Sequence, residues 1–327
     1  MRTIKEKIMI MLMLFSMNLS YGQNNITIKG TIKGEANDSV FLKVDKYFIG
    51  DKYDMVRSPV SGGKFTINYK LDHNKIAELL YRNQSMQIYL EPGDDFTMDV
   101  ASGALDSTVS FSGKAAANNV FLLKFNNQFR KDYDSANLRE RMLNDNIDVF
   151  EIALFDSRKK QLEFYKNYSE FNNLSESFKK YMENTIKYYY YGNLFSYPII
   201  RGNADKNVLI VPHLPLAMIE NVDDKLENNE EALICETYRT FLNYYIIYKT
   251  SEANGFNKFK DYSNSMDKKC ATAQEKLKGS VFVYFLAKFL YDNCQNVLPS
   301  MDKKWMAVLV GADKFQRVCC HRQVEMQ

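Results

Sequence analysis

The hydrophobic pattern changes its period near residue 113, and this change restricts the chain to a two-part fold. Between residues 25 and 113 apolar residues recur at every second position, as in Phe65, Ile67 and Tyr69. A period of two is typical of strands that bury one face. From about residue 119 to residue 298 the apolar residues fall three and four apart, which is typical of amphipathic helices.

The first part, residues 23–113, is predicted to be an antiparallel β-sandwich or open barrel of six or more short strands. Its turns have recognisable chemistry, because "SGGKF" at 61–65 offers two glycines for positive φ and "EPGDDF" at 91–96 has Pro and Gly in type II turn order. The glycines at 62 and 63 lack the spacing of a phosphate-binding loop. We therefore expect strand connections at both places.

The second part, residues 114–300, is predicted to be all-α, which makes the fold class α+β. We expect six helices, near residues 115–132, 136–169, 174–193, 225–250, 255–276 and 278–297. "SYPIIRGN" is predicted to end a helix, and "VPHLPL" with its two prolines to be an extended connector. Residues 301–327 continue neither pattern and are predicted to be an irregular tail.

Residues 1–22 have the pattern of a secretory signal peptide. Three basic residues precede an apolar stretch from Ile8 to Leu19, and small residues lead to a predicted cleavage between Gly22 and Gln23. The alternative is a membrane anchor, which needs roughly 20 apolar residues, whereas this run has about twelve. The sequence therefore favours export of the mature chain from the cytoplasm.

The charge of the chain disfavours a nucleic-acid partner. Removal of residues 1–22 takes away three basic groups and Glu6, so the formal net charge falls from +3 to about +1. A nearly neutral chain has no excess field with which to attract phosphates. No later segment is apolar for long enough to cross a membrane, so we expect no transmembrane segment after cleavage.

The five cysteines do not form a disulfide or metal framework. They are odd in number, lie in the last third of the chain and have no metal-like spacing. Cys235, Cys270 and Cys294 are predicted to be buried free thiols in helices. The sequence suggests no cofactor and no metal site.

The last two cysteines, Cys319 and Cys320, are adjacent and are followed by His321. A catalytic dithiol normally separates its cysteines by two residues, and a disulfide between neighbours needs a strained ring. One histidine does not complete a metal site. Cys319 and Cys320 are the redox candidates of the chain, although they lack the spacing of a catalytic dithiol.

The other polar residues suggest no catalytic site. His73 lies in a polar turn and His213 between prolines, so both are predicted to face solvent or to pack. The acidic pairs at 94–95, 223–224 and 230–231 are neighbours that point apart, and are predicted to lie in solvated turns and helix ends. The tyrosine run at 188–191 is predicted to pack in a helical core or against a partner, since no basic groove accompanies it.

Four stretches carry a resemblance to a known family: "ITIKGTIKGEANDSVFLKV", "GGKFTINYKL", "MQIYLEPGDDFTMDV" and "VSFSGKAAANNVFLLKF". Through them, residues 26–123 resemble the front half of TlpA-like thiol-disulfide oxidoreductases of Gram-negative envelopes. In that family a signal peptide precedes a small β-domain, a helical region and a thioredoxin-like domain. The resemblance covers about the first third of the chain well and the helical part more weakly.

The chain departs from that family at the residues that carry catalysis. The thioredoxin-like domain brings a WCxxC segment, but here the only tryptophan, Trp305, stands in "DKKWMAV", and no CxxC occurs. About 27 residues follow Ser300, whereas a thioredoxin domain needs roughly 100. No catalytic residue of the family has a matching position here, and the resemblance implies a chain that lacks the catalytic domain through truncation or a frameshift.

The leading interpretation is a secreted, non-catalytic interaction or substrate-positioning module with an envelope protein or peptide partner. One alternative is an atypical envelope redox protein that uses Cys319 and Cys320. A second alternative is a glycan- or peptide-binding envelope protein, because tyrosine and phenylalanine each occur 22 times.

Overall fold

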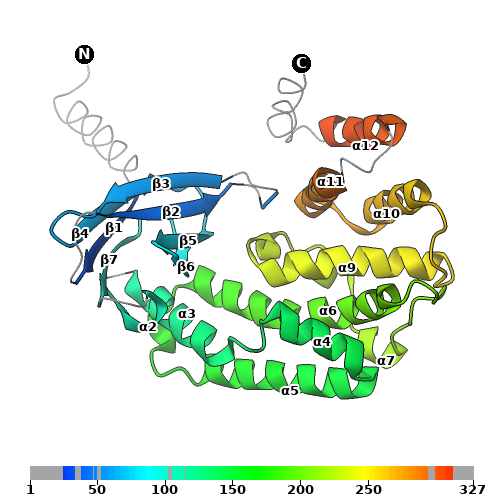
Figure 1. Ribbon diagram of the computed structural model, residues 1–327, viewed down its shortest axis with the longest axis horizontal. Helices are drawn as coiled ribbons and strands as arrows, with labels where there is room; N and C mark the ends of the chain where they lie inside the picture. The colour runs from blue at the N-terminus through cyan, green and yellow to red at the C-terminus, as the bar shows by residue number, and fades with distance from the viewer. Residues whose placement is uncertain are drawn as a thin grey trace, which may run out of the picture. The chain divides into compact units, whose positions relative to one another are not determined.

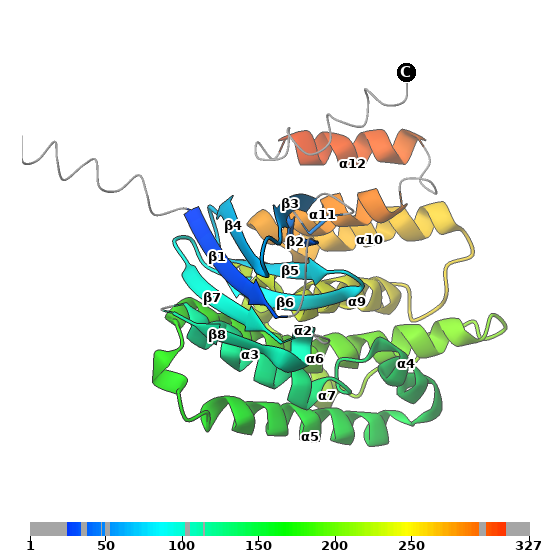
Figure 2. The same ribbon diagram turned by 60° about the vertical axis from the view of Figure 1, so that its left-hand side comes forward.

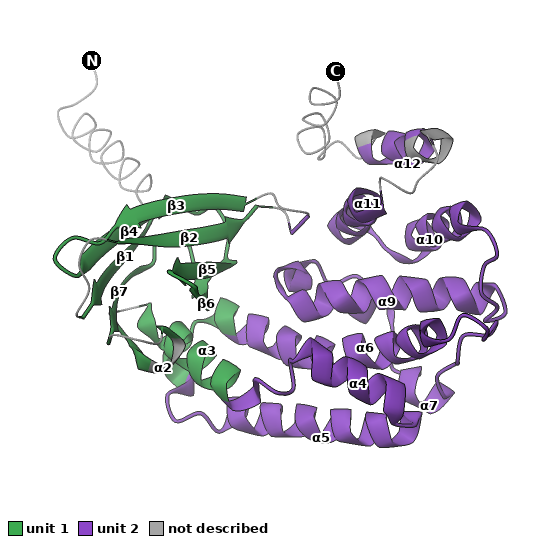
Figure 3. Cartoon of the chain, viewed as in Figure 1, with its two compact units in different colours: residues 1–47, 53–127, 172–178 green, residues 48–52, 128–171, 179–327 purple. Residues whose placement is uncertain are grey.

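A computed structural model shows the chain as two compact units, coloured separately in Figure 3. It describes residues 25–33, 38–46, 48–49, 53–101, 105–113, 115–293 and 299–311. Unit 1 is built from the residues before 128, apart from 48–52, together with residues 172–178. Unit 2 holds the remaining helices. The predicted signal peptide, residues 1–22, lies outside the described residues.

Unit 1 contains eight described strands in two four-stranded sheets, with the orders β4-β1-β7-β8 and β3-β2-β5-β6 (Figure 1). The strands are β1 (Asn25–Ile32), β2 (Ser39–Asp45), β3 (Tyr53–Pro59), β4 (Lys64–Lys70), β5 (Lys75–Tyr81), β6 (Gln84–Leu90), β7 (Asp95–Val100) and β8 (Val109–Ser112). All pairings are antiparallel except that of β1 with β7, which lie side by side in Figure 2. The predicted α+β fold, with an antiparallel-rich β part before the helices, is confirmed.

The period-two residues fill one shared core between these sheets. In β1, Ile26, Ile28 and Ile32 are almost fully buried, while the residues between them are more exposed or lack a side chain to bury. Gly30 breaks the series because the Phe65 ring occupies the space that a Cβ would need. Burial of one face per strand is what the alternating pattern predicts.

The outer edge of β6 is covered at Tyr89 by a side chain. Asn119 donates its amide N–H to the carbonyl of Tyr89 (3.0 Å) and accepts from the N–H of Tyr89 (2.8 Å). An amide side chain thus takes the place of a neighbouring strand, which prevents further strand pairing there. Asn119 is itself buried, in α3 (Ala116–Phe129).

Unit 1 extends beyond the boundary predicted at residue 113. The ring of Phe178 packs against Tyr89 (centroids 4.9 Å apart) and Phe121 (5.8 Å). Ser175 donates its N–H to the side-chain oxygen of Asn118 (3.1 Å). Residues 115–127 and 172–178 therefore belong with the sheets, and the helical pattern begins before the β unit ends.

The described helices differ in number from the six expected. Those described are α2 (Leu105–Thr108), α3, α4 (Ser135–Asn144), α5 (Ile147–Lys166), η2 (Phe171–Asn173), α6 (Glu176–Ala204), α7 (Leu216–Ile219), α8 (Asp224–Glu227), η3 (Glu230–Ile234), α9 (Glu236–Ala253), α10 (Tyr262–Lys276), α11 (Gly279–Asn293) and α12 (Pro299–Gly311).

The single helix predicted over 136–169 is two helices. Asn146 begins α5 by accepting a hydrogen bond from the N–H of Val149 (2.9 Å), which is the geometry of an N-cap. Asp145 before it is extended. The apolar spacing continues across this break, so periodicity did not reveal it.

The proline of "SYPIIRGN" does not end its helix, because α6 continues through Pro198 to Ala204. Proline removes one backbone hydrogen bond and strains the preceding turn. Here the flanking Tyr197 and Ile199 are buried, and Tyr197 and Arg201 both donate to the carbonyl of Asp145, at 2.9 and 2.6 Å. These contacts outweigh the local cost of the proline.

Two further segments differ from the prediction. The helix expected over 225–250 is broken into α8, η3 and α9, and the predicted irregular tail is helical from its start to Gly311. Trp305 of α12 is buried and donates its indole N–H to Asp267 of α10 (2.9 Å). The apolar residues of this segment span too few turns for their spacing to predict an amphipathic helix.

Replacing Asn119 tests the closure of the β6 edge. Asn119→Ala removes the two hydrogen bonds that this side chain makes with the N–H and C=O of Tyr89, so we expect a loss of about 2 kcal/mol in the free energy of unfolding. Urea unfolding followed by circular dichroism measures it. Gln128→Ala, at an exposed position of the same helix, is the matched control. Equal stability of the two variants would contradict this role.

Candidate functional site

The sequence-predicted redox residues cannot be placed by the structure. Cys319, Cys320 and the neighbouring His321 lie outside the described residues, as does Cys294. Their proposed chemistry stays a prediction.

The other two cysteines are confirmed as buried free thiols, but only Cys270 lies within a helix as predicted. Cys235 lies between η3 and α9, where its thiol is 3.5 Å from the carbonyl oxygen of Tyr181, and Cys270 lies in α10. Burial raises the pKa of each thiol to about 12. A thiol with so high a pKa forms almost no thiolate at neutral pH, so neither is poised for redox chemistry.

The two described histidines do not face a partner for catalysis. His73 is exposed in the turn between β4 and β5. His213 is also exposed, and its ring lies 5.7 Å from that of Phe256. The prediction that they face solvent or pack is confirmed.

Two acidic residues of unit 1, Glu91 and Asp94, are hydrogen-bonded at the turn between β6 and β7. The N–H of Glu91 donates to the Asp94 carboxylate (2.7 Å), and the hydroxyls of Ser175 and Ser177 both donate to the Glu91 carboxylate. Burial, and secondarily the charge of Glu91, raise the pKa of Asp94 to about 6 despite that backbone hydrogen bond. The sequence did not predict this arrangement, because the two serines that bond to Glu91 come from a segment more than 80 residues away. The arrangement holds the start of α6 against the turn.

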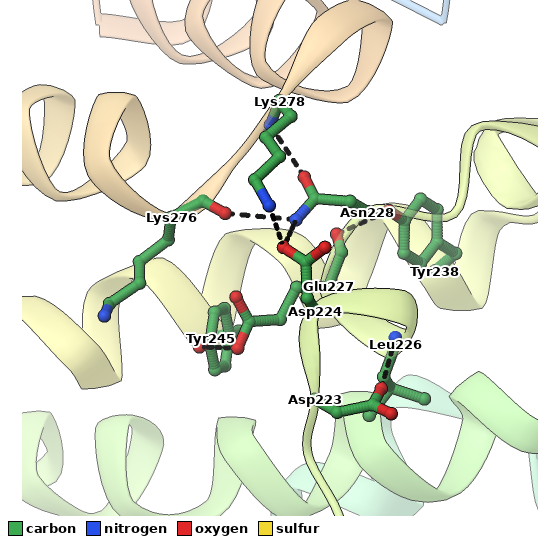
Figure 4. Close-up of polar contacts among 9 residues, drawn as sticks. All are labelled: Asp223, Asp224, Leu226, Glu227, Asn228, Tyr238, Tyr245, Lys276 and Lys278. Carbon is green, nitrogen blue, oxygen red and sulfur yellow. Dashed lines mark hydrogen bonds and ion pairs between the residues drawn. The ribbon is translucent and has the colours of Figure 1, made fainter.

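A second polar cluster lies in unit 2 and is centred on Asn228 (Figure 4). Its amide N–H donates to the carbonyl of Lys276 (3.1 Å), and its side-chain oxygen accepts from the backbone N–H of Lys278 (2.7 Å). The Asp224 carboxylate accepts from the same amide and forms an ion pair with the Lys278 ammonium group. These contacts join the end of α8 to the turn between α10 and α11.

Glu227 in the same cluster is held by two tyrosines of α9. Tyr245 donates its hydroxyl to the Glu227 carboxylate, and Tyr238 donates to the Glu227 carbonyl oxygen (2.8 Å). Burial raises the pKa of the Glu227 carboxyl, and the hydrogen bond from Tyr245 opposes that shift. Asp223, the neighbour of Asp224, caps α8 through the N–H of Leu226 (2.9 Å). The prediction that the acidic pairs lie in solvated turns and helix ends is confirmed for Asp223 and Asp224, which are exposed. It is wrong for Asp94, which is half-buried in its turn.

The acidic side chains of both clusters are thus hydrogen-bonded to groups that hold a turn or a helix end in place. Within the described ranges, no three or more His, Cys, Asp or Glu side chains are grouped so as to hold a metal ion. Among the helices of those same ranges, none has the length and apolar character needed to cross a bilayer.

Exposed apolar residues distinguish one connector of unit 2, the one between α6 and α7. Val208, Leu209 and Ile210 are exposed by 42, 70 and 59%, and Leu216 at the start of α7 by 79%. Single exposed apolar residues are ordinary, but consecutive ones are typical of interaction sites. We call residues 208–210 the apolar edge segment.

The apolar edge segment is held firmly from one side. The N–H of Lys258 donates to the carbonyl of Leu209 (2.8 Å), and the N–H of Val211 donates to the carbonyl of Phe256 (2.7 Å). Farther along, the N–H of Leu214 donates to the buried hydroxyl oxygen of Tyr248 (3.0 Å). Val211 and Leu214 are buried, so the connector is anchored immediately beside its exposed part.

The other side of this segment offers a free backbone edge. Ile210 forms an antiparallel bridge with Asn257 in which the hydrogen bonds are made by the residues on either side. In such a pair the N–H and C=O of the central residue point away from the partner strand. In the part of the chain that the structure describes, no group bonds to the N–H or C=O of Ile210.

The sequence predicted an extended connector over residues 211–216, and it made no prediction for residues 208–210. In the structure residues 211–215 lie in no helix or strand, as expected, but Leu216 begins α7. Exposure depends on how few neighbours surround the segment, which periodicity does not report.

Comparison with known proteins identifies no relative. No protein-family model matches the chain, and no curated protein matches it.

The pKa of Asp94 predicts a pH-dependent effect on stability. Its pKa is about 6 in the folded chain against an ordinary 3.8, so its ionisation destabilises the fold progressively between about pH 4 and 6 and fully above that. Asp94→Asn cannot ionise and keeps an oxygen for the Glu91 N–H. We expect it to be more stable than the wild type by about 1–2 kcal/mol at pH 7.5, with no difference near pH 4.

Urea unfolding at several pH values measures this difference. The control is Asp95→Asn, because Asp95 is exposed and its ion pair with Lys29 (3.5 Å) is also exposed. We expect the control to change stability by less than about 0.5 kcal/mol at either pH. An Asp94→Asn variant that is destabilised at pH 7.5 would contradict the raised pKa.

Proposed function

We propose that the chain is a non-catalytic interaction module of a Gram-negative cell envelope, which binds an extended segment of a partner polypeptide. The observation that carries this proposal is the apolar edge segment, where three consecutive apolar side chains flank a backbone edge with an unused N–H and C=O. A partner that adds a strand there gains main-chain hydrogen bonds and apolar contacts together.

The chemistry of the polar residues supports a binding role. Asp94, Glu91, Asp224 and Glu227 each hold a turn or a helix end in place through the hydrogen bonds described above. Cys235 and Cys270 are buried with raised pKa values. None of these groups is free to act on a substrate without loss of its structural contacts.

Export to the envelope and the TlpA-like relationship are parts of the same proposal. Export is supported by the charged and apolar pattern of residues 1–22, and the relationship by the strand and turn motifs of residues 26–123. In such a role the module positions a polypeptide substrate for a redox partner.

A glycan-binding role has less support than a peptide-binding role. Glycan sites commonly expose aromatic faces, but Tyr188, Tyr189 and Tyr190 of the tyrosine run are buried. Ring contacts of Tyr188 with Tyr238 and Phe241 show that this run forms part of a helical core. Core packing, as predicted, is therefore its observed role.

Peptide binding at the apolar edge segment is tested with a displayed library of random ten-residue peptides. Selected peptides are assayed by fluorescence anisotropy, and exchange of the Ile210 amide hydrogen is followed in the complex. Ile210→Pro removes the outward N–H but leaves the bonds of Leu209 and Val211, so we expect affinity to fall at least about tenfold.

The control for this test is Leu216→Lys, which changes an exposed apolar residue outside the segment. We expect it to bind the selected peptides like the wild type. A library that yields no binding peptide, or peptides that bind Ile210→Pro equally well, would count against the proposal.

The non-catalytic part of the proposal is tested with thiol chemistry. We expect no reduction of insulin disulfides above the uncatalysed rate. Cys235 and Cys270 should react with a thiol reagent at pH 8 only after unfolding, because their pKa values are about 12. Turnover that is lost in the double variant Cys319→Ser, Cys320→Ser would instead establish the redox alternative.

A further inference from the structure

The outer face of α5 carries three large apolar side chains that remain exposed in the part of the chain that the structure describes. Val149, Ile152 and Phe155 are exposed by 51, 59 and 50%. At 100° per residue, Ile152 points about 170° away from the mean direction of the buried residues of this helix, and the other two lie about 60° to either side of it. They form a stripe centred on the solvent face, which we call the α5 stripe.

Helix formation does not account for the α5 stripe. Valine, isoleucine and phenylalanine have lower helix propensity than the lysines and glutamates that usually occupy such positions. The core of unit 2 receives the opposite face, through Phe150, Leu154, Gln161 and Tyr165. A row of exposed apolar residues across two turns is typical of a face that another helix covers.

The charges around the α5 stripe fit a second copy of the same helix. Exposed Asp148 lies before the stripe and exposed Lys159 after it, on the same side of the helix. In an antiparallel pair with a twofold axis between Ile152 and Phe155, each Ile152 faces the partner's Phe155. The same register brings each Asp148 opposite the partner's Lys159, so two ion pairs form by symmetry.

The other acidic residues near the axis do not oppose this register. Glu151 would face the partner's Asp156, but its carboxylate accepts a hydrogen bond from Tyr190 (2.6 Å) and is turned toward α6. Antiparallel helices also place opposite ends of their dipoles together. A twofold symmetric contact of one surface with itself is the commonest arrangement in homodimers.

We propose that the chain forms a homodimer through antiparallel pairing of the α5 stripe of two copies. This inference does not depend on the apolar edge segment or on its partner. One helix pair buries a small area, so the expected dissociation constant is weak, on the order of 10–100 µM.

Sedimentation velocity of the purified chain at about 1–300 µM tests the proposal. We expect a concentration-dependent dimer for the wild type and a monomer throughout this range for Ile152→Ser, Phe155→Ser, with an unchanged circular dichroism spectrum. Leu216→Ser removes an exposed apolar residue elsewhere and should dimerise like the wild type.

Charge reversal tests the register itself. Asp148→Lys and Lys159→Asp each bring like charges together and should weaken the dimer at least about fivefold at low salt. The double variant restores opposite charges and should recover most of the affinity. A monomeric wild type, a dimer that survives loss of the α5 stripe, or a double variant weaker than both single variants would overturn the proposal.

Discussion

The N–H and C=O that Tyr89 of edge strand β6 directs away from β5 need partners, and Asn119 supplies both. Its amide bonds to these two backbone groups, so at Tyr89 the sheet meets a helix instead of an open edge. Because Asn119 is the fourth residue of α3, the same contact decides where the helical chain begins on the β unit. The serine contacts of Glu91 and the rings of Phe121 and Phe178 add to this connection.

Tyrosine hydroxyls play a comparable part in unit 2. Tyr188, Tyr238 and Tyr245 place their rings in the core between α6 and α9 while their hydroxyls reach the chain at residues 226–229. Tyr248 is also buried, and its hydroxyl oxygen accepts a hydrogen bond from the N–H of Leu214. A tyrosine buries a large apolar ring and still satisfies a polar group at its tip. These hydroxyls thereby hold irregular connectors of unit 2 in place.

The way in which these segments are anchored affects the free energy of binding a partner. The apolar edge segment is irregular in backbone, yet its neighbours Val211 and Leu214 are buried and hydrogen-bonded. The α5 stripe lies on a helix of 20 residues whose opposite face is in the core. A surface that is already ordered loses less conformational entropy on binding than a mobile one. Both surfaces are therefore suited to weak but specific contacts of small area.

The sequence alone specified the α+β class, the alternation that buries one face of each strand, the turns at residues 61–65 and 91–96, and the burial of Cys235, Cys270 and the tyrosine run. These follow from local periodicity and side-chain chemistry. Packing between distant segments decided the rest. Asn146 divides a helix that the spacing made continuous, and α6 passes Pro198 because Tyr197 and Arg201 bond to Asp145. The hydrogen bonds from Ser175 and Ser177 to Glu91 depend on which distant segments meet in space. The exposure of residues 208–210 and of the α5 stripe likewise depends on which segments pack nearby. Periodicity reports the direction of a side chain along its own element, whereas exposure is set by what the folded chain brings against it.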